Sequence, residues 1–473
     1  MRSPSTLDST ESKVNSIPAG GENPKQFNWK EVWYPVHYIK DLDKTKPTRF
    51  TLLEKDVVIW WDKNSQSWQC FEDKCPHRLA PLSEGRINQE GLLECPYHGW
   101  TFSGSGKCEE IPQQTPGKTA QESKRACVKA CPTIEAQGLL FVYPGESENA
   151  ANVTVPIVKP LEETPDEWIV LDTFRDLPYD ALTLLENVLD ASHVSFTHHG
   201  SVGNRSNAST VDLEVVESGR QGFQGVWEEG PRKGTLGRQE TTFIAPHLMW
   251  HDLTSKQFGR TLTVVYATPI SKGRCRLFAR FPFKFSSPIP KLFMKLSPPW
   301  YTHLGQNNVL EDDQIFLHYQ ERYLDQLGGS EKFAKAFYLP TKADRFVVEL
   351  RNWVNQYEAE PFPDETLSPA LSTEQLLDRY SSHTIHCSSC RSALKNIQQL
   401  RLFLGILAVT GWAIAPLISL TLNNIWIVAF LTVISLSCGA VWLGLGKLEK
   451  RFYQGQETPA RNLPEKGKNS RSN

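Results

Sequence analysis

The sequence predicts an α+β protein in which two soluble domains are followed by a hairpin of two membrane-spanning helices. Three features lead to this prediction: short strands separated by turns in the first third, helices alternating with strands in the middle, and two long apolar runs near the C-terminus. At 473 residues, the chain is also too long for one ordinary hydrophobic core. We expect a disordered leader over 1–27, a β domain over 28–145, an α+β domain over 146–396, the hairpin over 397–447 and a polar tail over 448–473.

The composition argues against a nucleic-acid partner and against secretion. Lysine and arginine number 51 against 53 aspartates and glutamates, so no strong electrostatic field favours a polyanion. Residues 1–28 lack the apolar core of a signal peptide and contain Asp8, Glu11 and Glu22, whereas organelle transit peptides avoid acidic residues. We therefore expect the ten cysteines to include metal ligands in a reducing compartment rather than a disulfide framework.

Each soluble domain has its own pattern of hydrophobic residues. In the first domain, short antiparallel strands are predicted within 49–61, 67–72, 92–102 and 138–145. In the second domain, apolar residues at helical spacing predict a helix over 179–196, ended by His199-Gly200, and another from about 301 to 326. Strands are predicted between these helices at 211–228, 237–245, 261–268 and 275–283.

The two apolar runs, 402–422 and 425–445, each have about 21 residues without a charge, the length that a helix needs to cross a bilayer. Only Asn423 and Asn424 lie between them, which leaves room for a tight turn alone. Two buried core helices are the alternative interpretation. Basic residues flank both ends of the pair, which should keep both ends and the soluble domains on the cytoplasmic-type side: Arg391, Lys395, Arg401, Lys447, Lys450 and Arg451.

Two cysteines and two histidines form a metal-binding pattern in the first domain. Cys75-Pro-His77 is followed after 17 residues by Cys95-Pro-Tyr-His98. This spacing fits a [2Fe–2S] cluster in which thiolates hold one iron and neutral imidazoles hold the other. A zinc ribbon is the alternative, although zinc sites usually repeat C-x2-C or pair H-x3-H.

A second pattern contains Asn187, Asp190, His193 and His198. Non-haem Fe(II) oxygenases hold their iron with two histidines and one carboxylate, and leave positions open for O2 and substrate. Asp190 and His193 are three residues apart and can project from one helical face. His193 and His198 are five residues apart, or about 140° around a regular helix, so both can bind one metal only if the helix ends or distorts between them.

At these residues the sequence resembles the Rieske oxygenases. EVWYPV (31–36) resembles the entry strand of their Rieske domain, and CPHRLAPLSEG (75–85) and CPYHGWTF (95–102) resemble its two cluster loops. Residues 187–198 match the N-x2-D-x2-H-x4-H pattern of their catalytic domains. The resemblance implies a Rieske [2Fe–2S] domain, a helix-grip-like catalytic domain with a mononuclear non-haem Fe(II), and electrons supplied by a ferredoxin or a reductase.

The same resemblance implies roles for the residues of the second pattern. His193 and His198 would bind the iron, and Asn187 would lie near it. Asp190 would hydrogen-bond a Rieske histidine of a neighbouring subunit, which implies a ring of subunits such as a homotrimer.

The third iron ligand should be a carboxylate from the later helix. The segment from Asn308 to Gln314 resembles the carboxylate segment of the family, and aligning its closing glutamine with Gln320 places Asp313 at the ligand position. Asp312 and Glu311 are close enough to take that position instead, and an ordinary solvated acidic run is the other interpretation of these two.

A last pattern, Cys387-Ser-Ser-Cys390, precedes the apolar runs. Half a zinc site, a redox-active dithiol and ordinary loop cysteines all fit it; no second cysteine pair is placed to complete a zinc site, and the spacing suits reversible disulfide chemistry. A Rieske oxygenase with this pair before a terminal hairpin resembles the subfamily of pheophorbide a oxygenase, chlorophyllide a oxygenase and the Rieske protein of the chloroplast import translocon. In that subfamily the pair is a candidate thioredoxin target.

The resemblance to this subfamily implies an oxygenase that acts on an apolar, chlorophyll-derived tetrapyrrole, with monooxygenation and dioxygenation both open. It also implies a membrane protein whose catalytic domain faces the cytoplasm or stroma. The short leader suggests the thylakoid or plasma membrane of a cyanobacterium. The alternative function is a membrane-bound, thioredoxin-regulated Rieske protein that senses redox state and is associated with a protein translocon.

Overall fold

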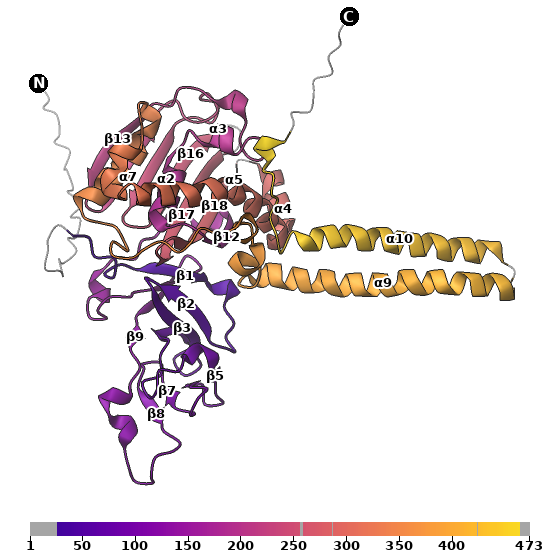
Figure 1. Cartoon of the computed structure of the whole chain (residues 1–473), viewed down its shortest axis with the longest axis horizontal. Helices are drawn as coiled ribbons and strands as arrows, with labels where there is room; N and C mark the ends of the chain where they lie inside the picture. The colour runs from indigo at the N-terminus through magenta and orange to yellow at the C-terminus, as the bar shows by residue number, and fades with distance from the viewer. Residues whose placement is uncertain (1–25, 256–258, 286, 423, 464–473) are drawn as a thin grey trace, which may run out of the picture.

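The computed structural model describes residues 26–463, apart from 256–258, 286 and 423. The leader expected over 1–27 lies outside the described residues except for its last two. Figure 1 shows a small β domain, a larger α+β domain beside it, and a pair of long helices that projects to one side. This arrangement confirms the predicted fold class.

The N-terminal domain contains three small antiparallel sheets, as its strands and turns predict. In the first sheet, β11 (Leu139–Val142) lies between β1 (Tyr34–Tyr38) and β10 (Thr133–Ala136). The second sheet has the order β2 (Thr48–Leu52), β3 (Lys55–Asp62), β4 (Ser67–Glu72) and β9 (Ala130–Cys131). The third has the order β5 (Arg86–Ile87), β6 (Leu93–Glu94), β7 (Thr101–Phe102) and β8 (Cys108–Glu110).

The second domain is built on a seven-stranded antiparallel sheet. Its order is β12 (Ile169–Leu177), β18 (Arg274–Lys284), β17 (Gly259–Ser271), β16 (Leu248–Ser255), β15 (Gln239–Ile244), β14 (Gly222–Trp227) and β13 (Leu213–Gly219). The sequence pattern did not identify β12 or β16. In β12 the charged residues Asp172 and Asp176 hide the strand pattern, but each is paired with an arginine of β18, at 2.9 Å and 2.6 Å.

Helices cover one face of this sheet (Figure 1). They are α2 (Ala181–Leu189), α5 (Pro299–Gln326) and α7 (Arg345–Gln356), and their apolar side chains share one core with the sheet and with β1. α5 matches the predicted helix 301–326, whereas the predicted helix 179–196 is divided into α2 and the single turn α3 (Val194–Thr197). The remaining short helices are α1 (Lys159–Glu163), α4 (Pro288–Leu296), α6 (Phe333–Ala336) and α8 (Thr373–Leu376).

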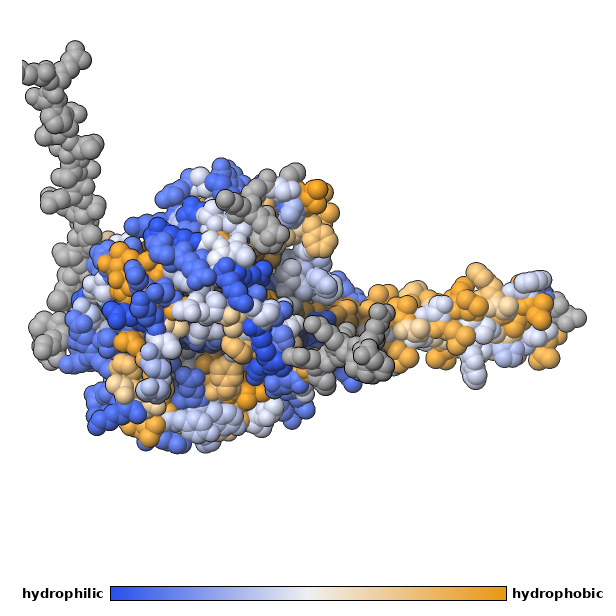
Figure 2. All heavy atoms as spheres, turned by 90° about the horizontal axis from the view of Figure 1, so that it is seen from above, coloured by the Kyte–Doolittle hydropathy of each residue, from blue (hydrophilic) through white to orange (hydrophobic). Residues whose placement is uncertain are grey.

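The projecting pair consists of α9 (Ser388–Leu422) and α10 (Ile425–Lys450). Both helices are long and apolar enough to cross a membrane, and only 6% of the most apolar window of each is buried. Figure 2 shows hydrophobic surface along much of the pair. Such exposure excludes the alternative of two buried core helices.

After α10 the chain returns to the second domain. The side chain of Phe452 is fully buried, and its carbonyl accepts a hydrogen bond from the Thr384 hydroxyl at 2.7 Å. Three residues further on, the Gly455 amide donates to the carbonyl of Leu377 at 2.9 Å. The part of the predicted polar tail that the structure describes is therefore packed against the domain.

Candidate metal centres

The four residues of the first pattern lie on two loops, one after β4 and one between β6 and β7. The loops share the same backbone hydrogen bonds. The amides of Cys75 and Cys95 donate to the carbonyls of Ala80 and Trp100, both at 2.8 Å. Because the loops have matching conformations on neighbouring parts of one small domain, they can close over a single cluster.

Burial separates the thiols of this group from the imidazoles. Cys75 and Cys95 are 1% and 2% exposed, whereas His77 is exposed and His98 is half-buried. The ring centroids of His77 and His98 lie 4.5 Å apart, and Trp100 stacks on His77 at 4.7 Å. A hydrogen bond with the Cys75 side chain is the main cause that lowers the pKa of Cys95 to about 6. The arrangement fits a cluster with a buried thiolate-bound iron and an imidazole-bound iron at the surface.

A break in the helix brings the histidines of the second pattern together. α2 ends at Leu189, and His193 and His198 flank the single turn of α3. Their ring centroids lie 5.2 Å apart. The helix breaks earlier than predicted because the carboxylate of Asp190 accepts hydrogen bonds from the amide and hydroxyl of Ser192, at 2.8 Å and 2.6 Å.

Asp313 of α5 completes a group with these two histidines. The ligand atoms of His193, His198 and Asp313 all lie within 4.8 Å of one another, and Nε2 of His198 is 3.2 Å from an Asp313 oxygen. Nδ1 of His193 donates to the carbonyl of Asp190, which leaves Nε2 with a free lone pair. Two imidazoles and one carboxylate are the donor set typical of a mononuclear non-haem Fe(II).

Asp312 holds His198 from the opposite side. Its Oδ2 lies 3.3 Å from Nδ1 of His198 and accepts a hydrogen bond from the Ser201 hydroxyl at 2.8 Å. With its Nδ1–H directed at Asp312, His198 turns Nε2 toward Asp313, and Nε2 is the nitrogen that a metal ion would bind in place of a proton. Burial disfavours the charged ring, but the hydrogen bonds and charges of Asp312 and Asp313 outweigh burial and raise the pKa of His198 to about 9.

Glu311 faces away from the two histidines. Its oxygens accept hydrogen bonds from Arg175 at 2.7 Å and from Arg379 at 2.7 Å and 2.6 Å. Burial favours the protonated acid, but the two guanidinium groups outweigh it and lower the pKa of Glu311. The three consecutive acids therefore have three different environments, and Asp313 is the one whose carboxylate groups with both histidines.

Asn187 and His251 support the end of α2. Nδ2 of Asn187 lies 3.5 Å from Oδ1 of Asp313. His251 donates through Nε2 to the carbonyl of Val188 at 2.9 Å, while its Nδ1 accepts from the Thr241 hydroxyl at 2.8 Å. Burial lowers the pKa of His251 to about 4, so this ring is neutral at ordinary pH. His251 is a positioning residue that sequence position alone did not identify.

The C-terminal segment contacts the His193–His198–Asp313 group, and the sequence did not predict this contact. Nη1 of Arg461 donates to the carbonyls of Asp312 and Thr197, at 2.5 Å and 3.4 Å. The carbonyl of Arg461 accepts a hydrogen bond from Nη2 of Arg205 at 2.9 Å. No spacing rule connects residues so far apart in the chain, so only the packed structure identifies Arg461.

The cysteine pair of the last pattern is buried beside two histidines. Cys387 and Cys390 are each 1% exposed. His303 of α5 and His383 of a π-helical turn (Tyr380–Thr384) complete a second group whose ligand atoms all lie within 4.8 Å of one another. The sequence has no second cysteine pair to accompany this one, and the structure places two histidines there instead.

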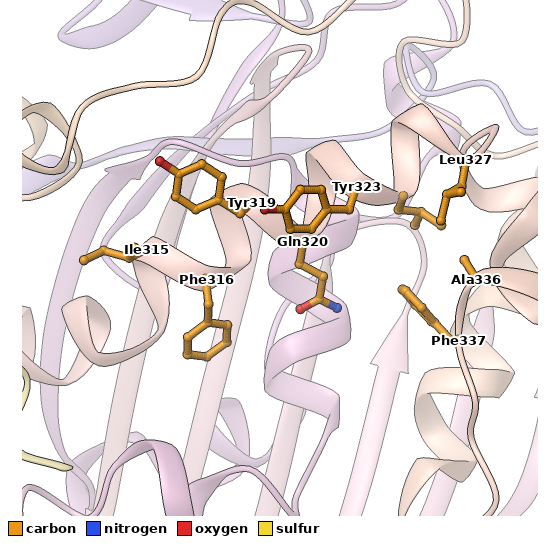
Figure 3. Close-up of a pocket in the computed structure, with 9 residues that line it drawn as sticks. Ile315, Phe316, Tyr319, Gln320, Tyr323, Leu327, Ala336 and Phe337 are labelled. Atoms are coloured by element: carbon orange, nitrogen blue, oxygen red, sulfur yellow. The ribbon is translucent and has the colours of Figure 1, made fainter. Parts of the chain in front are cut away.

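α5 also lines an apolar hollow of about 440 Å³ (Figure 3). Phe316, the first aromatic side chain of its wall, lies three residues after Asp313 on the same helix. The hollow opens to solvent, since Tyr323 and Leu327 are each 60% exposed. Its lining residues are Ile315, Phe316, Tyr319, Gln320, Tyr323, Leu324, Leu327, Ala336 and Phe337.

Comparisons with known proteins agree with these two centres. A family model described as Rieske [2Fe-2S] domain matches residues 32–132, and one described as Pheophorbide a oxygenase matches residues 243–331. The chloroplastic pheophorbide a oxygenase of Arabidopsis thaliana is 36% identical over 94% of this chain and 87% of its own length. A chloroplastic flavonoid 8-hydroxylase of Ocimum basilicum is 34% identical over 90% of this chain and 85% of its own length.

A solved structure shows the same fold at lower sequence similarity. The crystal structure of dicamba monooxygenase bound to dicamba is 20% identical and aligns with a TM-score of 0.55, covering 70% of this chain and 97% of the monooxygenase chain. The fold, the two metal-binding groups and the similarity over nearly the whole length agree with one another. This chain belongs to the Rieske [2Fe–2S], mononuclear-iron oxygenases, in the family that includes pheophorbide a oxygenase.

Proposed function

We propose that this protein is a membrane-anchored oxygenase of a chlorophyll-derived tetrapyrrole that receives electrons from a ferredoxin or a ferredoxin-type reductase. The convergence of two imidazoles and one carboxylate is the observation that carries the proposal, in a chain 36% identical to pheophorbide a oxygenase over 94% of its length. We assign the cluster to Cys75, His77, Cys95 and His98, and the mononuclear iron to His193, His198 and Asp313.

An iron bound by this group supplies the reductive activation of O2 beside the substrate. The protein's part is to bring two imidazoles and one carboxylate together, a donor set that would hold the iron and leave positions open for O2 and substrate. Asp312 fixes the ring of His198 by accepting a hydrogen bond from its Nδ1–H. Asn187 lies beside the carboxylate of Asp313 and restrains its rotation.

We also propose that the subunits form a homotrimeric ring. Figure 1 shows α3 on the large domain and the strands β5 and β7, which lie next to the cluster loops, on the distant part of the N-terminal domain. The two centres of one chain are therefore far apart, and a short electron route requires a second subunit. In the proposed ring Asp190, whose side chain is 29% exposed, hydrogen-bonds a cluster histidine of the next subunit.

Exposed apolar side chains at both centres support this ring. Leu79 and Tyr97, beside the cluster, are 71% and 56% exposed. Phe196 and Val202, beside the iron site, are each 55% exposed. Contact between these two surfaces would bury apolar area on both subunits and exclude water from the electron route.

We propose that α9 and α10 cross a membrane and that the soluble domains remain on its cytoplasmic or stromal side. Basic residues at the base of the pair favour this orientation, among them Arg401, Lys447 and Lys450. The short helix α4 extends the apolar surface near this base (Figure 1); four of its large hydrophobic side chains are exposed, namely Ile289, Leu292, Phe293 and Leu296. An apolar substrate dissolved in the bilayer could reach the enzyme without crossing water.

The hollow on α5 is our candidate for substrate binding. Its wall contains Phe316, Tyr319 and Tyr323, and aromatic side chains favour a large, flat, conjugated ligand. The Ocimum relative is named for hydroxylation of a flavonoid, which is also flat and aromatic, so a test must offer both classes.

The direct test is turnover of reduced, detergent-solubilised protein under heavy-isotope O2. Pheophorbide a, chlorophyllide a, a flavone and a native pigment–lipid extract are offered, and products are read by mass spectrometry. We expect label in a tetrapyrrole. Label in the flavone alone, or no label from protein proven to contain both iron centres, contradicts the proposal.

Two variants test the assignment of the residues. His193→Ala should lose the mononuclear iron and keep the reduced-state EPR signal of the cluster; loss of both refutes two separate centres. Asp190→Asn should keep both metals and stop single-turnover oxygenation, and full activity of this variant refutes the bridge.

A thioredoxin-regulated redox sensor is the second candidate function, and the cysteine pair at the base of the hairpin is the observation in its favour. Wild-type protein with and without thioredoxin separates the two candidates. A sensor gives no labelled product, but thioredoxin changes the alkylation of Cys387 and Cys390. An oxygenase gives labelled product under both conditions.

A further inference from the structure

The group formed by His303, His383, Cys387 and Cys390 has the spacing of a tetrahedral metal site. Nδ1 of His303 lies 3.4 Å from the sulfur of each cysteine, and Nε2 of His383 lies 3.3 Å from Sγ of Cys390. In a tetrahedral zinc site with ordinary bond lengths, nitrogen and sulfur ligands are about 3.5 Å apart. The four side chains therefore need almost no rearrangement to bind one ion at their centre.

The hydrogen bonds of the two imidazoles fix their tautomers for metal binding. Nε2 of His303 contacts the carbonyl of Asp172 at 2.8 Å, and Nδ1 of His383 contacts the carbonyl of Phe174 at 2.6 Å. Carbonyls only accept hydrogen bonds, so these nitrogens carry the protons. The other nitrogen of each ring then has a lone pair, and both lone pairs face the sulfur atoms. Metal-binding histidines are held by backbone carbonyls in this way.

The two carbonyls belong to an edge strand, and the geometry of that strand explains why both are free to accept hydrogen bonds from the histidines. β12 is the outermost strand of the large sheet and pairs only with β18 among the described strands. Alternate carbonyls of an edge strand have no partner strand. Asp172 and Phe174 are two residues apart, so both carbonyls point in the same direction. The edge of the sheet thus orients two imidazoles from different helical segments toward one point.

We propose that His303, His383, Cys387 and Cys390 bind one Zn²⁺ ion, at a centre separate from both iron sites. Two thiolates, two imidazoles and tetrahedral spacing are the donor set that zinc prefers. Binding forms two Zn–S and two Zn–N bonds and releases the two thiol protons to solvent. The complex of Zn²⁺ with two thiolates has no net charge, which suits a site where every ligand is at most 2% exposed.

Burial also distinguishes this site from a thioredoxin target. A disulfide reductase must reach a sulfur atom with its own thiolate, and both sulfurs here are 1% exposed. Both cysteines are free in the structure. A thiol pair enclosed by two oriented imidazoles is better explained by a bound ion than by a regulatory disulfide.

The proposed ion fastens the membrane hairpin to the catalytic domain. Cys387 immediately precedes α9 and Cys390 lies in its first turn, whereas His303 lies on α5, which packs against α9. α5 also carries Asp313. A rigid joint at this point would hold the iron-binding helix at a fixed height above the bilayer. The proposal does not depend on the substrate, because it rests on residues outside the iron site.

The test is the metal content of full-length protein purified in detergent without chelators. We expect one zinc per chain beside the iron of the two other centres, measured by inductively coupled plasma mass spectrometry. Cys387→Ser/Cys390→Ser should lose that zinc and keep the iron. Cys127→Ser changes an exposed cysteine and is the matched control, which should keep the zinc. Protein produced with cobalt should show the visible bands of tetrahedral thiolate-bound Co²⁺.

The outcomes separate this site from zinc bound elsewhere and from a disulfide. Zinc that persists in Cys387→Ser/Cys390→Ser overturns the proposal, since the zinc would then be bound elsewhere in the protein. A zinc-free wild type with an intact Cys387–Cys390 disulfide, or iron in place of zinc at this site, also overturns it. If the double variant does not fold, the cobalt spectrum of the wild type and protection of its thiols from alkylation until a chelator is added decide the question.

Discussion

The carboxylate of Asp312 lies 3.3 Å from Nδ1 of His198, on the side of the ring opposite to Asp313. Two neighbouring acids of α5 thus contact the two ring nitrogens of one imidazole. Only Asp313 also lies close enough to His193 to bind the same metal ion. Asp313 is therefore the proposed iron ligand, whereas Asp312 orients the ligand His198. This difference leads to the first two predictions.

Asp312→Asn should weaken Fe(II) binding by about 10- to 100-fold, the usual cost of losing the partner of a metal-binding histidine. The amide cannot stabilise the Nδ1–H of His198 by charge, and the ring can rotate. The measurement is an anaerobic Fe(II) titration of protein with an intact cluster. Asp325→Asn, on an exposed acid of the same helix, is the control and should bind like wild type. Unchanged affinity in Asp312→Asn would mean that Asp312 does not position His198.

Glu311→Gln and Asp313→Asn should have different defects despite their proximity. Glu311→Gln leaves Arg175 and Arg379 buried without their carboxylate, which should destabilise the fold by about 3–5 kcal/mol. Asp313→Asn should keep the fold and lose the mononuclear iron. Thermal unfolding and iron content, measured on both variants, check this difference. Iron loss without destabilisation in Glu311→Gln would reverse the assignment.

Replacing residues 403–445 by a short Gly-Ser linker should give a soluble protein that keeps its iron. The helices are joined at their base by the ion pair of Arg401 with Glu449 and by the hydrogen bond of Gln398 to Glu449 at 3.1 Å, so a short linker can close the gap. Deleting 397–473 should instead destabilise the protein, because it removes the buried side chain of Phe452. Membrane anchoring is measured by whether the protein sediments with the membrane fraction. If the linker variant still sediments with membranes, α9 and α10 are not the sole anchor.

Arg461→Ala should weaken Fe(II) binding although Arg461 is no ligand. Its guanidinium holds the carbonyls of Thr197 and Asp312, which adjoin His198 and Asp313. Losing these hydrogen bonds should loosen both ligand segments and raise the Kd for Fe(II) several-fold. Arg125→Ala, on an exposed arginine of the N-terminal domain, should leave the Kd unchanged. Equal Kd values for both variants would show that the C-terminal segment does not support the iron site.

Glu321→Gln should stabilise the protein more at pH 9 than at pH 6. Burial, reinforced by Asp180, raises the pKa of Glu321 to about 9, above its ordinary value of 4.5. The folded state therefore holds a proton that the unfolded state releases, and stability from Glu321 is full below pH 4.5 and lost as the pH rises through 9. Thermal unfolding at both pH values checks the sign. The exposed Glu331→Gln should show no such difference, and a larger gain at pH 6 would contradict the assignment.

Several parts of this protein follow from local sequence. The cluster loops could be predicted because Cys75 and His77, like Cys95 and His98, lie within a few residues of each other, where loop geometry fixes their separation. α5 and the hairpin were identified because hydrophobic spacing and length are properties of a single helix. The need for a break between His193 and His198 followed from the helical angle alone.

The tertiary structure decided what depends on contacts between distant segments. Three consecutive acids look alike in the sequence, and only the contacts of α5 with other segments direct Asp313 to the histidines and Glu311 to two arginines. His303 and the cysteine pair are more than 80 residues apart, and Arg461 lies still farther from His198. Spacing rules describe neighbours along one element, whereas the contacts between elements are set by how their buried faces pack. For that reason the sequence predicted both iron centres but not the histidines beside Cys387 and Cys390.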